Sequence, residues 1–208
     1  MSIIDKWNQW YKDLPKEPST TLYGDTLSYK MGADFLKDCE IVEDWGVGTG
    51  AFKLHRPDAI GVDGSDTPHA DVKADLTTYT SDCDGIFLRH VLEHNKDWQK
   101  ILINAIKSAR KVCVINFMPL STKGTVELED VSFQNRKYGV DVPTFSLGID
   151  QFKKIFKSVN VDVVEESYAT ETIFLITKGD TQGNTQDNTQ GNTKNMSQVK
   201  QKLEGFCK

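Results

Sequence analysis

IVEDWGVGTG, residues 41–50, is a short apolar run that leads into a glycine-rich turn. A second apolar run at 59–63 ends in the acidic residue Asp63. Short apolar runs bounded by glycine and aspartate are typical of buried strands in a parallel sheet. Glycines let the backbone approach a ligand closely, and a carboxylate at the end of the next strand can bind ribose hydroxyls. We therefore predict a nucleotide-type cofactor site at the carboxyl ends of these two strands.

Apolar runs alternate with helical patterns along most of the chain. Strands are predicted at 41–45, 59–63, 70–73, 85–88 and 112–117, and helices at 2–14, 26–37, 97–109 and 150–159. Ser2 and Asp5 are predicted to cap the first helix. Strands alternating with helices need crossover connections, which predicts an α/β, doubly wound, mostly parallel sheet. The runs at 161–164 and 172–177 leave no room for a helix between them, so the sheet should end in an antiparallel hairpin.

Charge and composition disfavour several classes of protein. The chain has 208 residues and a net charge of −5, which fits one domain and disfavours nucleic acid as a partner. The cysteines have no paired spacing, so a disulfide framework is not expected; they are Cys39, Cys83, Cys113 and Cys207. There is no signal-peptide pattern and no apolar run of about 20 residues. We expect a cytoplasmic protein without a membrane segment.

Composition divides the chain into four segments. Residues 1–38 are predicted to form a helical substrate cover, and residues 39–178 the cofactor-binding domain. Residues 179–195 contain the repeat TQGN, TQDN, TQGN, which lacks apolar residues and predicts a disordered low-complexity linker. Residues 196–208 match a short amphipathic helix through Met196, Val199, Leu203 and Phe206. It is either a frayed terminal helix or a surface for a protein partner or self-association.

The glycine-rich turn also matches the dinucleotide pattern GxGxxG/A, so other segments are needed to identify the cofactor. Four segments resemble, in order, the motifs of class I S-adenosylmethionine-dependent methyltransferases: 43–50, 61–65, 74–76 and 84–94. The first is an acidic residue followed by GxGxG, and the last is a strand that leads into VLEH. The terminal hairpin is similar to the end of that family's seven-stranded, Rossmann-like sheet. This resemblance, over about residues 40–178, implies a methyltransferase that uses S-adenosyl-L-methionine.

The resemblance also implies a set of cofactor-binding residues. Three glycines would cradle the cofactor, and Asp44 would orient its amino-acid end. Asp63 would hold the ribose, and Asp75 with Leu76 would face the adenine. His90, at the end of the fourth strand, completes the implied set. The set is Asp44, Gly46, Gly48, Gly50, Asp63, Asp75, Leu76 and His90. No metal ligand is implied.

Catalytic roles are expected where the fourth strand ends. His90 is the expected base or orienter for the methyl acceptor, because a positioned imidazole can accept its proton. A histidine at a strand end is, however, often only a structural hydrogen-bonding group. Arg89 is the expected partner of an anionic substrate, and His94 is expected to anchor the following helix. The region 50–63 departs from the family, because it leaves room for a first helix of only two turns.

The methyl acceptor is expected to be a small polar or sugar-like molecule. In this architecture it would be covered by residues 1–38 and 118–146. The second segment carries aromatic and basic residues suited to that role: Phe133, Arg136, Lys137, Tyr138 and Phe145. A solvated loop with a few core anchors would have the same composition, so both interpretations stay open.

Three other functional hypotheses compete with methyl transfer. Residues 90–94 match HxxEH, a zinc-peptidase signature in which His90 and His94 would share a helix face. Glu93 would then be the general base, and the third ligand would be one of three glutamates, Glu165, Glu166 or Glu171. An NAD-dependent oxidoreductase would explain the glycines and Asp63, but not the antiparallel end of the sheet. A non-catalytic binding protein would act through its C-terminal tail.

Overall fold

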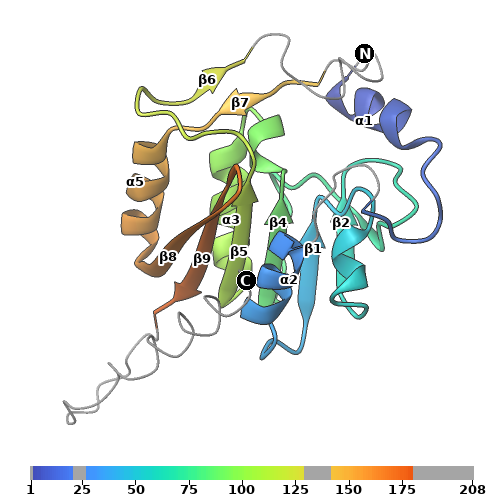
Figure 1. Ribbon diagram of the computed structural model, residues 1–208, viewed down its shortest axis with the longest axis horizontal. Helices are drawn as coiled ribbons and strands as arrows, with labels where there is room; N and C mark the ends of the chain where they lie inside the picture. The colour runs from blue at the N-terminus through green and yellow to red at the C-terminus, as the bar shows by residue number, and fades with distance from the viewer. Residues whose placement is uncertain (1, 21–26, 129–141, 180–208) are drawn as a thin grey trace, which may run out of the picture.

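Seven strands form one central sheet in the computed structural model, which describes residues 2–20, 27–128 and 142–179 (Figure 1). In spatial order they are β3 (Val72–Lys73), β2 (Ile60–Asp63), β1 (Val42–Trp45), β4 (Gly85–Arg89), β5 (Lys111–Asn116), β9 (Glu171–Lys178) and β8 (Val161–Tyr168). The first five strands are parallel to their neighbours. β9 is antiparallel to both β5 and β8. The predicted α/β sheet with an antiparallel end is therefore confirmed.

The hairpin β8–β9 is longer than the sequence predicted. β8 continues from the apolar run at 161–164 through Glu165 to Tyr168, although these residues are mostly polar. They remain extended because β9 supplies a hydrogen-bonding partner along the whole length of β8. The chain then turns at Ala169, whose φ is 50°. β9 begins at Glu171, one residue before the predicted start at 172.

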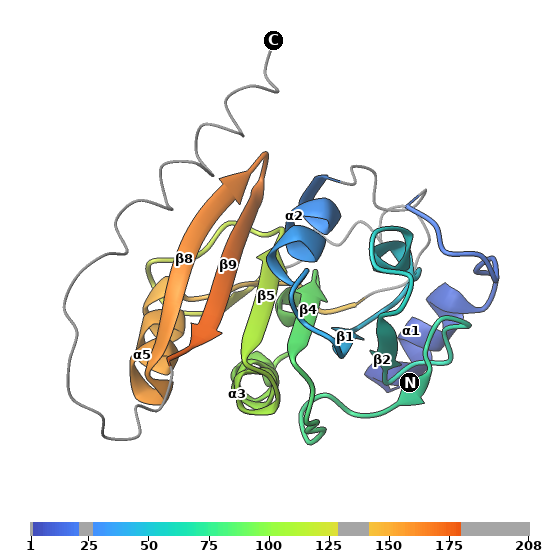
Figure 2. The ribbon, with the colours of Figure 1, turned by 90° about the horizontal axis from the view of Figure 1, so that it is seen from below.

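Helices cover both faces of the sheet (Figure 2). α3 (Trp98–Ser108) and α5 (Ile149–Val159) pack on one face, against Ile86 and Leu88. α2 (Leu27–Phe35) and η1 (Ala51–Leu54) pack on the other face, against Phe87. Successive residues of β4 thus point to opposite faces and are buried on both. This two-sided burial explains why the strands are continuous apolar runs.

α1 (Ile3–Tyr11) lies above the carboxyl ends of β1 and β2, away from both helix layers (Figure 1). Its predicted capping box is confirmed: Ser2 Oγ accepts a hydrogen bond from Asp5 N at 3.1 Å, and Asp5 Oδ2 accepts one from Ser2 N at 2.8 Å. The helix ends at Tyr11, earlier than the predicted end at 14, and residues 12–13 form a turn.

The segment after the glycine-rich turn is shorter still than expected. Instead of a two-turn α-helix, η1 is a 3-10 helix of 4 residues. Pro57 stands three residues beyond its end, and a turn there returns the chain to β2. The prediction of a first helix of two turns was therefore wrong.

The region 118–146 contributes a second, 2-stranded sheet made of β6 (Val126–Glu127) and β7 (Phe145–Ser146). Phe145 is buried there, so its side chain is a core anchor. The other residues expected to cover a substrate lie outside the described residues: Phe133, Arg136, Lys137 and Tyr138. The predicted linker and tail also lie outside them from residue 180 onward. Within the described ranges, none of the helices combines the length and apolar character needed to cross a bilayer.

Candidate cofactor site

The turn after β1 depends on three glycines. Gly46, Gly48 and Gly50 have φ values of 78°, 47° and 71°, a left-handed region that L side chains rarely adopt. Space is limiting as well as conformation, because a Cβ on Gly46 would lie 2.4 Å from Cγ2 of Val91. These glycines therefore allow the chain to reverse tightly at the end of β1 and to pass close to the segment after β4.

Asp63, the last residue of β2, lies directly beside this turn. Its Oδ2 accepts a hydrogen bond from Gly48 N at 3.2 Å. Its Oδ1 accepts hydrogen bonds from Ser65 N at 2.9 Å and from Ser65 Oγ at 2.7 Å. The structure thus brings the carboxylate and the glycine-rich turn together, and fixes the orientation of the carboxylate.

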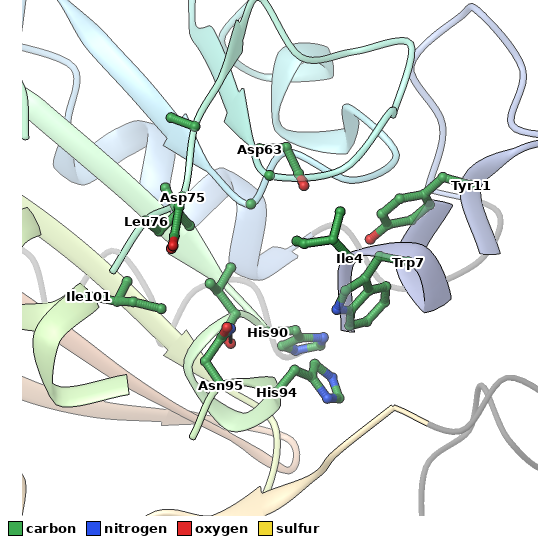
Figure 3. Close-up of a pocket in the computed structure, with 14 residues that line it drawn as sticks. Ile4, Trp7, Tyr11, Asp63, Asp75, Leu76, His90, His94, Asn95 and Ile101 are labelled. Atoms are coloured by element: carbon green, nitrogen blue, oxygen red, sulfur yellow. Dashed lines mark hydrogen bonds between the residues drawn. The ribbon is translucent and has the colours of Figure 1, made fainter. Parts of the chain in front are cut away.

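A pocket opens beside Asp63 at the carboxyl ends of the parallel strands (Figure 3). Of the residues implied by the sequence, five line it: Gly46, Asp63, Asp75, Leu76 and His90. The remaining implied residues do not line it: Asp44, Gly48, Gly50 and Arg89. The first three belong to β1 and the turn after it, where the chain is buried.

One wall of the pocket comes from the segment after β3. Asp75 Oδ1 accepts hydrogen bonds from Thr77 N at 2.9 Å and from Thr77 Oγ1 at 2.7 Å, which stabilises a local turn. This turn directs the adjacent Leu76 inward, where only 8% of the residue is exposed. The wall therefore offers an apolar surface next to a carboxylate, which suits a flat heterocycle with an exocyclic amine.

Asp44 is buried beneath the turn, with 4% of the residue exposed. Burial raises the pKa of its carboxyl to about 8, and the nearby charge of Asp63 adds to this effect. The charge of Lys53 acts in the opposite direction but does not compensate. A cationic group that approached Asp44 would favour its ionised form.

His90 lies at the end of β4 in an unusual backbone conformation. Its φ is 56°, and its backbone N donates to Ile115 O at 2.9 Å. The imidazole Nε2 lies 2.7 Å from Oε1 of Glu171, and the ring centroid lies 5.4 Å from that of Phe117. His90 therefore lines the pocket and contacts a buried carboxylate at the same time.

Arg89 does not have the position expected of a substrate partner. Its side chain is 6% exposed and lies on the α2 face of β4. It donates to Ser28 Oγ at 3.0 Å, to the Tyr29 hydroxyl at 3.0 Å and to Glu171 Oε1 at 2.6 Å. Arg89 does not line the pocket, although its guanidinium and the imidazole of His90 contact the same carboxylate oxygen. The pairing of Arg89 with an anionic substrate stays a prediction.

The HxxEH segment is not a continuous α-helix. His90 ends the fourth strand, and only Leu92–His94 form a short 3-10 helix, η2. Nδ1 of His94 lies 2.9 Å from Pro143 O, and burial lowers the pKa of this imidazole. Glu93 is buried and accepts a hydrogen bond from Phe117 N at 2.9 Å. The shared helix face that the zinc-peptidase hypothesis requires is therefore not formed. His94 contacts the backbone at Pro143, not the following helix that it was expected to anchor.

Several lining residues were not predicted from the sequence as cofactor-binding residues. Ile4, Trp7 and Tyr11 reach the pocket from α1, and Trp7 packs on Tyr11 with ring centroids 5.6 Å apart (Figure 3). Their helical spacing indicates a shared face, but spacing alone does not give the neighbour of that face. Val91, Asn95 and Ile101 complete the wall opposite α1. Asn95 Nδ2 donates to Val91 O at 2.6 Å, which no sequence signal indicates.

No protein-family model matches the chain, and no curated protein matches it either. Solved structures do match. Magnesium protoporphyrin IX methyltransferase from Synechocystis, with S-adenosylhomocysteine bound, is 14% identical with a TM-score of 0.56, over 85% of this chain and 98% of that one. The N-terminal domain of EvdMO1, with S-adenosylhomocysteine and D-fucose, is 13% identical with a TM-score of 0.53, over 71% and 79%. This chain has the class I methyltransferase fold.

A third structure with this fold is human N-acetylserotonin methyltransferase in complex with S-adenosylmethionine. It is 15% identical with a TM-score of 0.54, over 86% of this chain and 57% of that one. The methyltransferase fold places a crevice at the carboxyl ends of the strands. The pocket of this chain occupies that crevice, between the glycine-rich turn, Asp63 and His90.

Proposed function

We propose that this protein is a methyltransferase that uses S-adenosyl-L-methionine and acts on a small polar acceptor. The observation that carries the proposal is the hydrogen bond between Gly48 N and Asp63 Oδ2. It holds the carboxylate of Asp63 against the glycine-rich turn, within a methyltransferase fold, which supports a ribose-binding role for Asp63. A nucleoside in the adjoining pocket would contact Asp63 and Gly46, which both line it.

The residues present fit an adenosyl cofactor. Asp63 offers acceptor oxygens for two ribose hydroxyls, and the wall at Asp75 and Leu76 suits the adenine. Asp44 is buried beneath the turn and does not line the pocket, so its charge would act on the ammonium of the methionine end from below the turn. When bound, S-adenosylmethionine supplies an electrophilic methyl group on a sulfonium. The protein then has to orient an acceptor and remove its proton if it has one.

The acceptor would enter between α1 and the end of β4. Trp7 lies edge-on to His94, with ring centroids 5.4 Å apart, so α1 covers the side of the pocket next to His90 (Figure 3). We assign His90 as the base and residues 1–38 as the substrate cover. Because the chain is acidic overall, a polar metabolite, including a sugar-like molecule, suits this space better than nucleic acid. We also propose a cytoplasmic location.

Ligand-induced thermal shifts distinguish the competing functions. The full chain is heated with S-adenosylhomocysteine, with NAD or with zinc chloride, and the melting temperature is recorded. Only S-adenosylhomocysteine should raise it, because binding to the native state alone stabilises that state. A shift with NAD alone would favour an oxidoreductase, and no shift with any ligand would favour a non-catalytic binding protein. A metabolite screen with labelled methyl groups then identifies the acceptor.

Replacement of Asp63 tests the site directly. Asp63→Ala should weaken S-adenosylhomocysteine binding by about 1.5–3 kcal/mol, because charge-assisted hydrogen bonds to the ribose are lost. Isothermal calorimetry measures the change. Asp34→Ala is the matched control, since Asp34 is exposed on α2 away from the pocket. Equal affinity of the Asp63 variant and the unmodified chain would remove Asp63 from the site.

A further inference from the structure

Glu171 is a buried carboxylate next to the proposed active site. It is the first residue of β9, and 6% of its side chain is exposed. Its Oε1 lies 2.7 Å from Nε2 of His90 and 2.6 Å from an Arg89 guanidinium nitrogen. Glu171 does not line the pocket, so it acts on a ligand only through a residue that does.

Arg89 fixes this carboxylate in place and keeps it ionised. Ser28 and Tyr29 of α2 accept hydrogen bonds from the guanidinium, which also lies 4.3 Å from the centroid of the Tyr29 ring. Burial raises the pKa of Glu171, but the hydrogen bond from His90 and the charge of Arg89 outweigh it, so this pKa is lowered overall. The carboxylate therefore remains an acceptor near neutral pH.

His90 has two features that a purely structural histidine would not need. Its backbone φ of 56° is uncommon for a residue with a Cβ, and such conformations cluster at functional sites. Its side chain bridges the pocket and the ionised Glu171. A carboxylate accepts hydrogen bonds only, so the proton of the neutral imidazole must be on Nε2. The lone pair is then on Nδ1.

We propose that Glu171, held by Arg89, is a positioning residue that fixes the orientation and tautomer of His90 as the base. The inference rests on the proposed function. It favours hydroxyl acceptors, which must lose a proton as they are methylated. The acceptor oxygen forms a bond to the methyl carbon while the bond between that carbon and sulfur breaks. The electron pair stays on sulfur, and the hydroxyl proton moves to His90 Nδ1, from which it passes to water.

Imidazole NMR tests this inference without knowledge of the acceptor. The full ¹⁵N-labelled chain is measured in mildly alkaline buffer, with and without S-adenosylhomocysteine. The chain has 4 histidines, so His90→Gln assigns the His90 signals by difference. We expect neutral His90 as the Nε2–H tautomer. An Nδ1–H tautomer in the unmodified chain would overturn the proposal, and this measurement needs no Glu171 variant to fold.

Glu171→Gln tests the role of the charge. The ratio of the Nε2–H to the Nδ1–H form should fall by roughly fivefold, because a neutral hydrogen bond is weaker than a charge-assisted one. Glu165→Gln is the matched control, since it removes the same charge from an exposed position on β8. An unchanged His90 ratio in Glu171→Gln would overturn the proposal. Calorimetry with S-adenosylhomocysteine tests the proposed function independently of the tautomer measurement. Failure to bind would reject the proposed function, while the tautomer ratio would still report on the His90–Glu171 pair.

Discussion

Gly46 illustrates how one residue allows the site to form. Its φ is 78°, and a Cβ placed on it would lie 2.4 Å from Val91 Cγ2, which leaves no room for a side chain. We expect Gly46→Ala to lower the free energy of unfolding by roughly 2–4 kcal/mol, from backbone strain plus overpacking. Denaturant unfolding measures this change.

Gly124→Ala is the control for the conformational part of that cost. Gly124 has a φ of 88°, but a Cβ there would meet nothing within 4 Å. Its substitution should therefore cost only the strain of the left-handed region, about 1–2 kcal/mol. Equal losses in the two variants would show that contact with Val91 contributes nothing.

Asp44 should link cofactor binding to pH. In the free protein its pKa is raised to about 8 by burial, so the carboxyl is largely protonated at neutral pH. An ammonium group bound nearby stabilises the carboxylate, so binding should release a proton below about pH 8. Affinity for S-adenosylhomocysteine should accordingly rise as pH increases toward that value.

Calorimetry in buffers with different ionisation enthalpies measures the released proton. Asp44→Asn should abolish the release and flatten the pH dependence, because its side chain does not titrate. Proton release that persists in this variant would assign the effect to another group. The Asp44 carboxyl would then not act on the amino-acid end of the cofactor.

At the scale of elements, α1 forms one side of the pocket through a single face. Ile4, Trp7 and Tyr11 recur at intervals of three and four residues and all line the pocket. Trp7→Ala should weaken S-adenosylhomocysteine binding about fivefold, because roughly 1 kcal/mol of apolar contact is removed. The free energy of unfolding should change little, since Trp7 is only half-buried.

Gln9→Ala is the matched control for Trp7→Ala. Gln9 is exposed on the same helix and does not line the pocket. Calorimetry should give the unmodified affinity for this variant. Normal affinity in Trp7→Ala as well would show that α1 does not contribute to cofactor binding.

At the scale of the whole molecule, the folded domain should not depend on residues 180–208. The repeat within them contains no apolar side chain with which to extend a core. Deletion of residues 180–208 should leave the melting temperature and the affinity for S-adenosylhomocysteine unchanged. Thermal unfolding and calorimetry of the shortened chain measure both. A large drop in melting temperature would show that this segment packs on the domain.

The central sheet follows from local sequence patterns. Runs such as 41–45 and 112–117 predict buried parallel strands, because short, mostly apolar runs are typical of strands covered on both faces. The last two runs predict the antiparallel hairpin, because the link between them is too short for the crossover that parallel strands need. Element ends were less accurate: η1 is shorter than predicted and β8 is longer, because turns and strand partners decide where an element stops.

The amino-acid sequence by itself determined the order of strands and helices, the glycine turn and the acidic residue at the end of β2. These depend on interactions between near neighbours in the chain. Only the tertiary structure decided that His90 pairs with Glu171, 81 positions away, and that Arg89 contacts Ser28 of α2, 61 positions away. Such contacts arise when distant elements pack, and residue spacing carries no record of which side chains then meet.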